Sequence, residues 1–292
     1  MVAMAVRGRR RGGALPIRAL GLPRQLGQDV YHRLMVLSWP RLLGLFIGVF
    51  LVFNVLFALA YMADPQGIAV AREELAVPVF WRDFFFSVHT VATIGYGNMY
   101  PDDLFTNSVV VLEITLGIIY FALTTGMAFA RFSRPTARIL FSQVMVVREV
   151  DGVPTLMLRA ANQRHNMLYA AEARMSVLVD GELGGVAMRR FVELPLVKAS
   201  NPSFALTWVI MHAIDADSPL AGWLAEGRPD PRAEVIIILS GTDEVSGQLV
   251  HGRWAYNASE IIWGPRFADI ISTAPDGMRT IDYTRFHDVL EG

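Results

Sequence analysis

The sequence predicts a membrane protein in which two transmembrane helices flank a short re-entrant segment and an immunoglobulin-like β-sandwich follows. Three observations predict this fold class. The chain has 292 residues, of which 53% are hydrophobic and only 18% charged, and its mean hydropathy is +0.38. Two long, almost uncharged runs occupy its first half. Its second half carries short apolar runs separated by turn residues, which is typical of antiparallel strands.

The N-terminal region is basic. Residues 1–27 contain arginines but no acidic side chain, which predicts a disordered basic tail. Residues 28–38 place apolar side chains at helical spacing directly before the first apolar run, which favours a slide helix on the membrane surface. The alternative is that they simply begin the next helix. No apolar segment before residue 40 resembles a signal peptide.

Two runs predict transmembrane helices at about 40–63 and 104–132. Residues 42–63 carry no charge and, as a helix, would span roughly 30 Å, the thickness of the hydrocarbon layer. The second run is interrupted only by Glu113. Arginines flank the outer ends of the pair, so the positive-inside rule places both termini in the cytoplasm and 64–103 outside. We therefore expect a multi-pass protein of the cell inner membrane with a pore domain over 39–138.

Residues 139–292 predict the cytoplasmic β-sandwich, because the apolar runs there are short and no helix-length amphipathic stretch joins them. No G-x-G-x-x-G follows a strand, so a nucleotide-binding domain is not favoured. The chain has no cysteine, which excludes disulfides, thiolate zinc sites and cysteine nucleophiles. Its net charge of −1 gives no indication of a nucleic-acid partner. No arrangement of nucleophile and base indicates an enzyme.

The segment TVATIGYG at residues 90–97 lies between the two predicted spans. A dehydrated K⁺ needs a cage of oxygen atoms, and backbone carbonyls supply one only if consecutive residues point them at one axis. That requires positive φ at alternate residues, which Gly95 and Gly97 allow without steric cost. The preceding apolar stretch, 82–92, is too short to span and predicts a pore helix whose C-terminal dipole points toward the cavity.

Residues 93–97 are therefore the predicted K⁺ selectivity filter: Thr93, Ile94, Gly95, Tyr96 and Gly97. The Thr93 hydroxyl can form the innermost ring of oxygens, and the Tyr96 ring can support the strand from behind. One strand provides only one column of oxygens, so four chains must meet on an axis, which predicts a homotetramer. We expect no cofactor and no bound metal other than K⁺ ions in the filter.

The chain resembles the inwardly rectifying potassium channels, in particular their prokaryotic members. Besides the filter, ARFSRP at 130–135 resembles the end of that family's inner helix. SEIIWG at 259–264 and IDYTRFH at 281–287 resemble its later cytoplasmic segments. The similarity covers about residues 28–288 and implies a K⁺ channel that Ba²⁺ blocks.

The resemblance also assigns roles to residues outside the filter. Phe129 matches the constriction where the inner helices cross. Gly117 and Gly126 fall where inner-helix glycines permit bending, although both could instead allow close packing. A cytoplasmic loop at 241–248 matches the family's second narrowing of the pore. Its candidate residues are Gly241, Thr242, Gly247 and Gln248.

Three positions raise questions that the resemblance leaves open. Strong rectification in the family uses an acidic side chain in the cavity, but the matching position is Phe121. Glu113 lies two turns earlier, where it would face the top of the cavity or pair with the pore-helix backbone. His89 lies behind the filter, either as a pH-sensitive group or as a neutral packing residue.

Arg131, Arg134 and Arg138 follow the inner helix on its cytoplasmic side. Such clusters attract anionic lipid headgroups, although the positive-inside rule explains them equally well. In the family this region binds phosphoinositides. The leading hypothesis is thus a K⁺-selective channel modulated by anionic lipid. The alternatives are a poorly selective cation channel and a membrane-anchored binding domain with a vestigial pore.

Overall fold

A computed structural model describes residues 30–71, 77–135, 137–164, 166–273, 275, 277 and 279–291. The predicted basic tail, 1–27, lies outside the described residues, as does the start of the predicted slide helix. The described chain divides into two compact units, with the division between Arg134 and Pro135.

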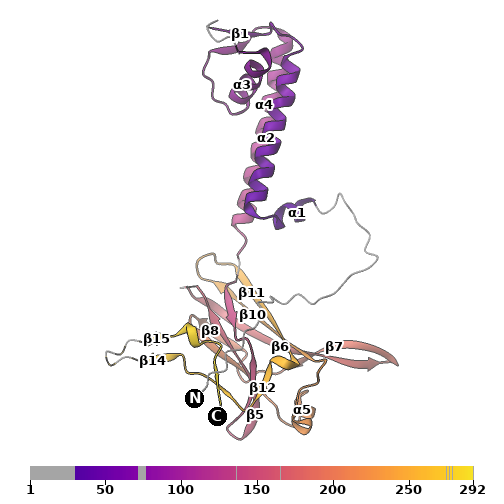
Figure 1. Cartoon of the computed structure of the whole chain (residues 1–292), viewed down its shortest axis with the longest axis vertical. Coiled ribbons are helices and arrows are strands. Elements are labelled where there is room, and N and C mark those ends of the chain that lie inside the picture. The colour runs from indigo at the N-terminus through magenta and orange to yellow at the C-terminus, as the bar shows by residue number, and fades with distance from the viewer. Residues whose placement is uncertain are drawn as a thin grey trace. The chain divides into compact units, whose positions relative to one another are not determined.

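The first unit is helical and carries both candidate spans (Figure 1). Its elements are α1 (Val30–Val36), α2 (Trp39–Tyr61), β1 (Ile68–Val70), α3 (Val79–Val91), β2 (Met99–Pro101) and α4 (Leu104–Phe132). Within the described residues, α2 and α4 are the two helices long and apolar enough to cross a membrane. At 13 residues, α3 is about 20 Å long and too short to do so.

Local chemistry defines the ends of these helices. Pro40 lies in the first turn of α2, where its missing N–H costs no hydrogen bond. Asp103 caps α4, because its side chain accepts a hydrogen bond from the Thr106 N–H at 2.7 Å. Between the spans, β1 pairs antiparallel with β2, with Ala69 opposite Tyr100. This short ribbon joins the segment that follows α2 to the segment that precedes α4.

The second unit consists mainly of two five-stranded sheets. One sheet has the order β11-β10-β6-β7, with β8 also paired to β6, and the other has the order β12-β4-β5-β3, with β9 also paired to β5. The strands of the first are β6 (Leu168–Leu183), β7 (Val186–Leu194), β8 (Ser200–Phe204), β10 (Glu234–Asp243) and β11 (Leu249–Asn257). Those of the second are β3 (Ile139–Phe141), β4 (Met145–Val150), β5 (Val153–Asn162), β9 (Thr207–Ala213) and β12 (Ile261–Trp263).

The two sheets share one hydrophobic core, which makes this unit a β-sandwich. Leu156 and Ile210 come from one sheet and Met175 and Ile237 from the other, and all four are fully buried in a single cluster. In β10 the buried side chains alternate with more exposed ones over Leu239 to Asp243, as expected for a strand with one face on a core. The antiparallel sandwich predicted from the sequence is present.

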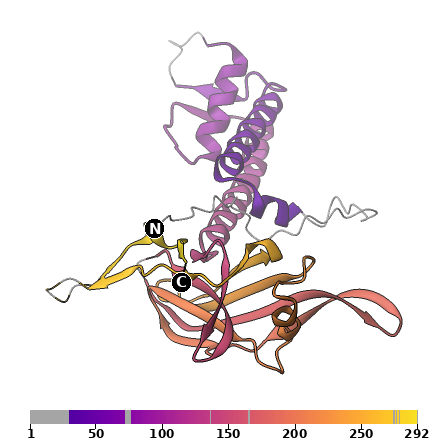
Figure 2. The ribbon, with the colours of Figure 1, turned by 60° about the horizontal axis from the view of Figure 1, so that its bottom comes forward.

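Several features of this unit differ from a purely antiparallel sandwich. The pair β12–β4 is parallel, with Ile262 opposite Val146. The β6–β7 hairpin projects beyond the rest of the sandwich, and the short helix α5 (Ala221–Glu226) lies in the connection to β10 (Figure 2). Further short strands form two separate pairs. They are β13 (Arg266–Phe267) with β16 (Val289–Leu290), and β14 (Ile271–Thr273) with β15 (Arg279–Ile281).

Neighbouring isoleucines of β10 provide a matched test of this core. Ile237 is fully buried whereas Ile238 is 41% exposed on the other face. We expect Ile237→Ala to lower the stability of this unit by about 2–5 kcal/mol, because it leaves a cavity, and Ile238→Ala to change it by less than about 0.5 kcal/mol. Thermal unfolding of the full chain in detergent, followed by circular dichroism, measures both. Equal losses would contradict the assigned faces.

Candidate ion-conduction site

The residues after α3 adopt an alternating backbone. Thr93, Gly95 and Gly97 have positive φ angles of 54°, 64° and 76°. In an ordinary strand successive carbonyls point to opposite sides, and a left-handed residue at every second position turns them toward the same side. The sequence attributed this freedom to the two glycines. The structure adds Thr93, a β-branched residue that rarely adopts positive φ.

The inner end of this strand is hydrogen bonded to the last turn of α3. The Thr93 N–H donates to the Thr90 carbonyl at 3.0 Å, and the Ile94 N–H donates to the His89 carbonyl at 2.9 Å. Beyond its outer end, the Ala71 N–H donates to the Asn98 carbonyl at 2.9 Å, next to the β1–β2 pair. The strand is therefore held at both ends, and its position depends on that of α3.

A cavity of about 280 Å³ lies beside this strand, lined by His89, Tyr96 and Ile114 among others. The His89 ring contacts the Tyr96 ring edge to face, with centroids 4.9 Å apart. His89 therefore packs against the aromatic side chain of the predicted filter in the usual geometry of an aromatic pair. This contact is compatible with either role that the sequence left open for His89. Tyr96 is 70% exposed in the single chain.

Glu113 lies in the interior of the helical unit. Its side chain is fully buried, the Tyr61 hydroxyl donates to its Oε2 at 2.5 Å, and its Oε1 lies within hydrogen-bond distance of the Ser87 Oγ. The expectation that Glu113 faces the cavity is wrong, because α2 and α3 enclose its carboxyl group. Its contact with the pore helix α3 is to a side chain and not, as the alternative supposed, to the backbone.

The two candidate hinge glycines have different surroundings. Gly117 is buried against α3, and a Cβ atom added there would overlap the side chain of Val91. Gly126 has open space around the position of an added Cβ. In this structure, therefore, Gly117 allows close approach of α3 and α4, the packing role that the sequence left open. Nothing in the packing of Gly126 requires a glycine.

Aromatic and basic side chains gather at the C-terminal end of α4. Phe129 is 73% exposed, and Phe121, two turns earlier, is 42% exposed. The Arg131 guanidinium donates to the Leu37 carbonyl and lies over the Trp39 ring at 4.7 Å. Arg131 thus joins the end of α4 to the junction of α1 and α2.

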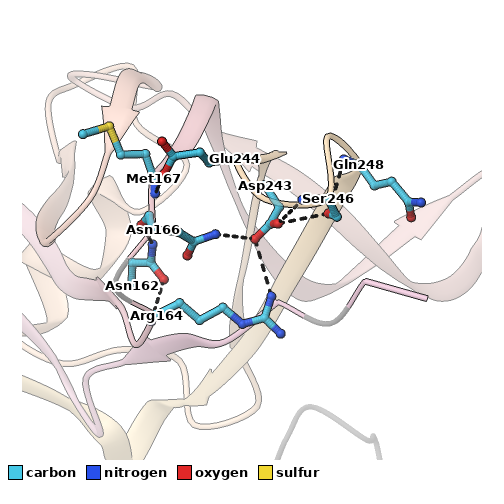
Figure 3. A network of polar contacts seen from close by, with 8 residues as sticks. All are labelled: Asn162, Arg164, Asn166, Met167, Asp243, Glu244, Ser246 and Gln248. Carbon is cyan, nitrogen blue, oxygen red and sulfur yellow. Dashed lines mark hydrogen bonds and ion pairs between the residues drawn. The ribbon is translucent and has the colours of Figure 1, made fainter. Parts of the chain in front are cut away.

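In the second unit, the predicted constriction loop follows β10 and is held by the carboxylate of Asp243 (Figure 3). The carboxylate accepts hydrogen bonds from the Ser246 N–H at 2.9 Å, the Ser246 hydroxyl at 3.0 Å and the Asn166 amide at 2.7 Å. Arg164 forms an ion pair with it at 3.4 Å. These interactions, above all the Ser246 N–H, lower the pKa of Asp243 to about 2.

The same loop contacts the segment between β5 and β6 a second time, since the Met167 N–H donates to the Glu244 carboxylate at 2.9 Å. Within the loop, Gly247 adopts a positive φ of 65°, which favours glycine. Gly241 is buried, whereas Gln248 is exposed. The loop was predicted from the sequence, but Asp243 and its partners were not. The Asp-x-x-Ser spacing, typical of a local side-chain turn, was the available signal.

Comparisons with known proteins assign both units. The sequence profile described as inward rectifier potassium channel C-terminal domain matches residues 139–291, and the profile described as ion channel matches 47–134. The inward rectifier potassium channel Kirbac3.1 of Paramagnetospirillum magnetotacticum is 41% identical over 96% of this chain and 94% of its own length. This chain belongs to the inward rectifier potassium channel family.

More distant relatives include animal channels. The human ATP-sensitive inward rectifier potassium channel 11 is 29% identical over 90% of this chain and 72% of its own length. The inward rectifier potassium channel irk-1 of Caenorhabditis elegans is 26% identical over 90% of this chain and 52% of its own length. The resemblance recognised from the sequence is confirmed, and the protein is a membrane ion channel rather than an enzyme.

The different surroundings of the two glycines in this inward rectifier lead to a prediction. We expect Gly117→Ala to destabilise the helical unit by about 1–3 kcal/mol, because the added methyl group overlaps Val91. Gly126→Ala should leave stability unchanged, since nothing lies near the new Cβ. Thermal unfolding in detergent measures this difference. If both substitutions alter ion flux alike without changing stability, Gly117 acts as a hinge and not through close packing.

A second prediction concerns acid. A carboxylate with a lowered pKa stabilises the fold above its unfolded pKa of about 4, and this stability is lost as pH falls through the folded value of about 2. We expect Asp243→Asn to cost about 1–3 kcal/mol near neutral pH, and the difference from wild type to vanish between these two values. Thermal midpoints against pH measure it. The exposed Asp217→Asn serves as control, and a pH-independent difference would contradict the assignment.

Proposed function

We propose that this protein conducts K⁺ selectively and passively through a filter formed by residues 93–97. The observation that carries this proposal is the alternation of left-handed residues at Thr93, Gly95 and Gly97. Such a strand presents successive carbonyl oxygens to one side, which is the arrangement that replaces the hydration shell of K⁺. K⁺ ions in the filter are the only bound metal in this proposal, and no cofactor is involved.

The channel is a homotetramer in this proposal. One chain supplies one column of oxygens, and a closed cage requires four around an axis. The single chain leaves Tyr96 and Phe129 largely exposed, at 70% and 73%. In a tetramer these exposed aromatic side chains would either be covered by neighbouring subunits or line the pore.

The gate lies at the end of α4. Four copies of Phe129 around the axis form an apolar ring that closes the pore by excluding water. Gly126, which no packing constraint holds, provides the bending point one turn before it. The loop that contains Gly241, Thr242, Gly247 and Gln248 forms a second constriction in the cytoplasmic unit.

The cavity of this channel lacks the acidic ring associated with strong rectification. Phe121 occupies the corresponding position and is partly exposed, while Glu113, the one acidic residue of α4, is buried. No carboxylate of α4 is therefore available to attract Mg²⁺ into the cavity. Block of outward current by cavity-bound Mg²⁺ should accordingly be weak.

The protein lies in the cell inner membrane with both termini in the cytoplasm, as the distribution of arginines indicates. Anionic lipid headgroups bind at the cytoplasmic end of α4. Arg134 and Arg138 are exposed, whereas the guanidinium of Arg131 is already engaged by Leu37 and Trp39. Arg134 and Arg138 therefore provide most of the lipid contact. No nucleic acid takes part.

Uptake of tracer Rb⁺ into K⁺-loaded proteoliposomes tests the function. We expect uptake that external K⁺ and Ba²⁺ suppress and Na⁺ does not, and that Gly95→Ala abolishes, because alanine is strained at positive φ. Suppression by Na⁺ as well would indicate the poorly selective cation channel. A complete absence of uptake, with or without anionic lipid and also after the gate is opened by substitution, would indicate the vestigial pore.

That gate substitution is itself a prediction. Phe129→Ala should raise resting uptake severalfold at equal protein, since it removes the apolar ring. Phe105→Ala is the matched control, because Phe105 is a half-exposed phenylalanine in the first turn of the same helix. Unchanged or lower uptake in Phe129→Ala, with normal assembly, would place the gate elsewhere.

A further inference from the structure

Four polar side chains meet inside the helical unit, enclosed by its three longest helices. Asn54 and Tyr61 belong to α2, Ser87 to α3 and Glu113 to α4. All four are fully buried within one chain. The Ser87 Oγ lies 2.9 Å from the Asn54 Oδ1 and also within hydrogen-bond distance of the Glu113 Oε1. The Tyr61 hydroxyl completes the cluster at the Glu113 Oε2.

The orientation of the Asn54 amide is fixed by its second contact. Its Nδ2 donates to the Phe50 carbonyl at 2.7 Å, an oxygen that can only accept. Rotating the amide by half a turn would place two acceptors against each other there. The atom that faces Ser87 is therefore Oδ1, which also can only accept. The hydrogen in the Ser87–Asn54 contact must then come from the Ser87 hydroxyl.

A serine hydroxyl has one hydrogen, and Asn54 receives it. The contact between the Ser87 Oγ and the Glu113 Oε1 still needs a hydrogen, and an ionised carboxylate has none to give. Tyr61 cannot supply it, because its hydroxyl donates to the other carboxyl oxygen. We propose that Glu113 is held as a neutral carboxylic acid, whose proton is donated to Ser87 and fixes the pore helix α3 against α4.

The contact between Ser87 and Glu113 is one of two that join α3 to α4, and the other is between Val91 and Gly117; we call the two contacts together the seam. Ser87 and Val91 are four residues apart on α3, and Glu113 and Gly117 are four residues apart on α4, so each pair lies on one face of its helix. Val91 packs against Gly117, as Ser87 does against Glu113. Between Ser87 and Val91 lies His89, whose carbonyl accepts the Ile94 N–H of the filter. The proton of Glu113 thus acts on the filter through α3, which makes Glu113 a positioning residue.

Loss of this proton would change the seam directly. The Glu113 Oε1 and the Ser87 Oγ would then be two oxygens without a hydrogen between them, unless Ser87 turned away from Asn54. The other titratable groups on the surrounding helices near the cluster, among the described residues, are Tyr61 on α2 and Arg82, Asp83 and His89 on α3. Arg82 and Asp83 form an ion pair at 2.8 Å, and the His89 ring packs on Tyr96. No cation among these is free to neutralise an ionised Glu113, so deprotonation should loosen α3.

Infrared difference spectroscopy of the full-length protein tests directly whether the Glu113 carboxyl group is protonated, and it does not depend on ion flux. The wild-type spectrum minus that of Glu113→Gln should show the carbonyl stretch of a protonated carboxylic acid at neutral pH. Glutamine keeps a donor for Ser87 and an acceptor for Tyr61, so the variant should fold. Absence of that band would overturn the proposal.

Two separate serine substitutions provide the second test, which also works if Glu113→Gln fails to assemble. Ser87→Ala removes the acceptor of the acid proton and should lower the pH at which the band disappears by about one unit. If Glu113 were instead an ionised acceptor, the same substitution would raise that pH. Ser108→Ala is the matched control, since its hydroxyl donates only to the Leu104 carbonyl of its own helix and should not move the band.

The functional consequence rests on the proposed K⁺ conduction. Ba²⁺-sensitive Rb⁺ uptake by the wild type should fall severalfold from neutral to alkaline pH, whereas uptake by Glu113→Gln should be independent of pH. Uptake at neutral pH with no alkaline fall would overturn the coupling of Glu113 to the filter but leave the proposed function intact. Absence of uptake throughout would contradict the proposed function. The infrared result would still show whether Glu113 is protonated.

Discussion

The backbone constraint at residues 93–97 determines much of the helical unit. Three left-handed residues alternate within five positions, and the first of them is Thr93, for which positive φ is unfavourable. Residues held in such conformations cost of order 1–3 kcal/mol each and persist only where the surroundings fix them. Here the last turn of α3 fixes them, because the Thr90 and His89 carbonyls bind the first two N–H groups of the strand. If residues 93–97 act as the proposed filter, their precise conformation requires an α3 that cannot shift.

The position of α3 is fixed from inside the subunit. Ser87 and Val91 hold one face of α3 against α4, and Phe86 packs edge to face on the Tyr61 ring of α2, with centroids 5.2 Å apart. In a membrane no water can satisfy buried polar groups, so the hydroxyl and carboxyl groups here must satisfy one another. Because one chain completes this network, the pore helix can be placed before subunits assemble. In the proposed tetramer, assembly then has to align four filters that are already formed.

The sequence predicted the features that a single local requirement determines. A bilayer demands an uncharged run of a certain length, so both spans were recognised, and only glycine accepts positive φ without cost, so Gly95 and Gly97 were identified. Thr93 was not recognised as strained, because its side chain disfavours the conformation that the fold imposes. The position of Glu113 could not be predicted either, since spacing along an apolar helix does not tell which neighbour each face meets. Strand β7 was missed because nearly all its side chains are exposed and alternate weakly.

The buried carboxyl groups of Asp243 and Glu113 show that contacts distant in sequence determine the charge of an acid. Asp243 faces donors from every side: the N–H and hydroxyl of Ser246, the Asn166 amide and the Arg164 guanidinium. Glu113 receives a hydrogen bond from the Tyr61 hydroxyl on one oxygen, and its other oxygen meets the Ser87 Oγ, whose hydrogen is directed to Asn54. Both acids lie on segments that the sequence predicted to line the pore, and apart from the Ser246 three residues after Asp243 nothing in their immediate sequence distinguishes their charge. The hydrogen-bond donors that the fold brings to each carboxyl group determine whether that group is charged. The cytoplasmic loop is thus held by a charge that stays constant at physiological pH, whereas the seam behind the filter depends on one proton.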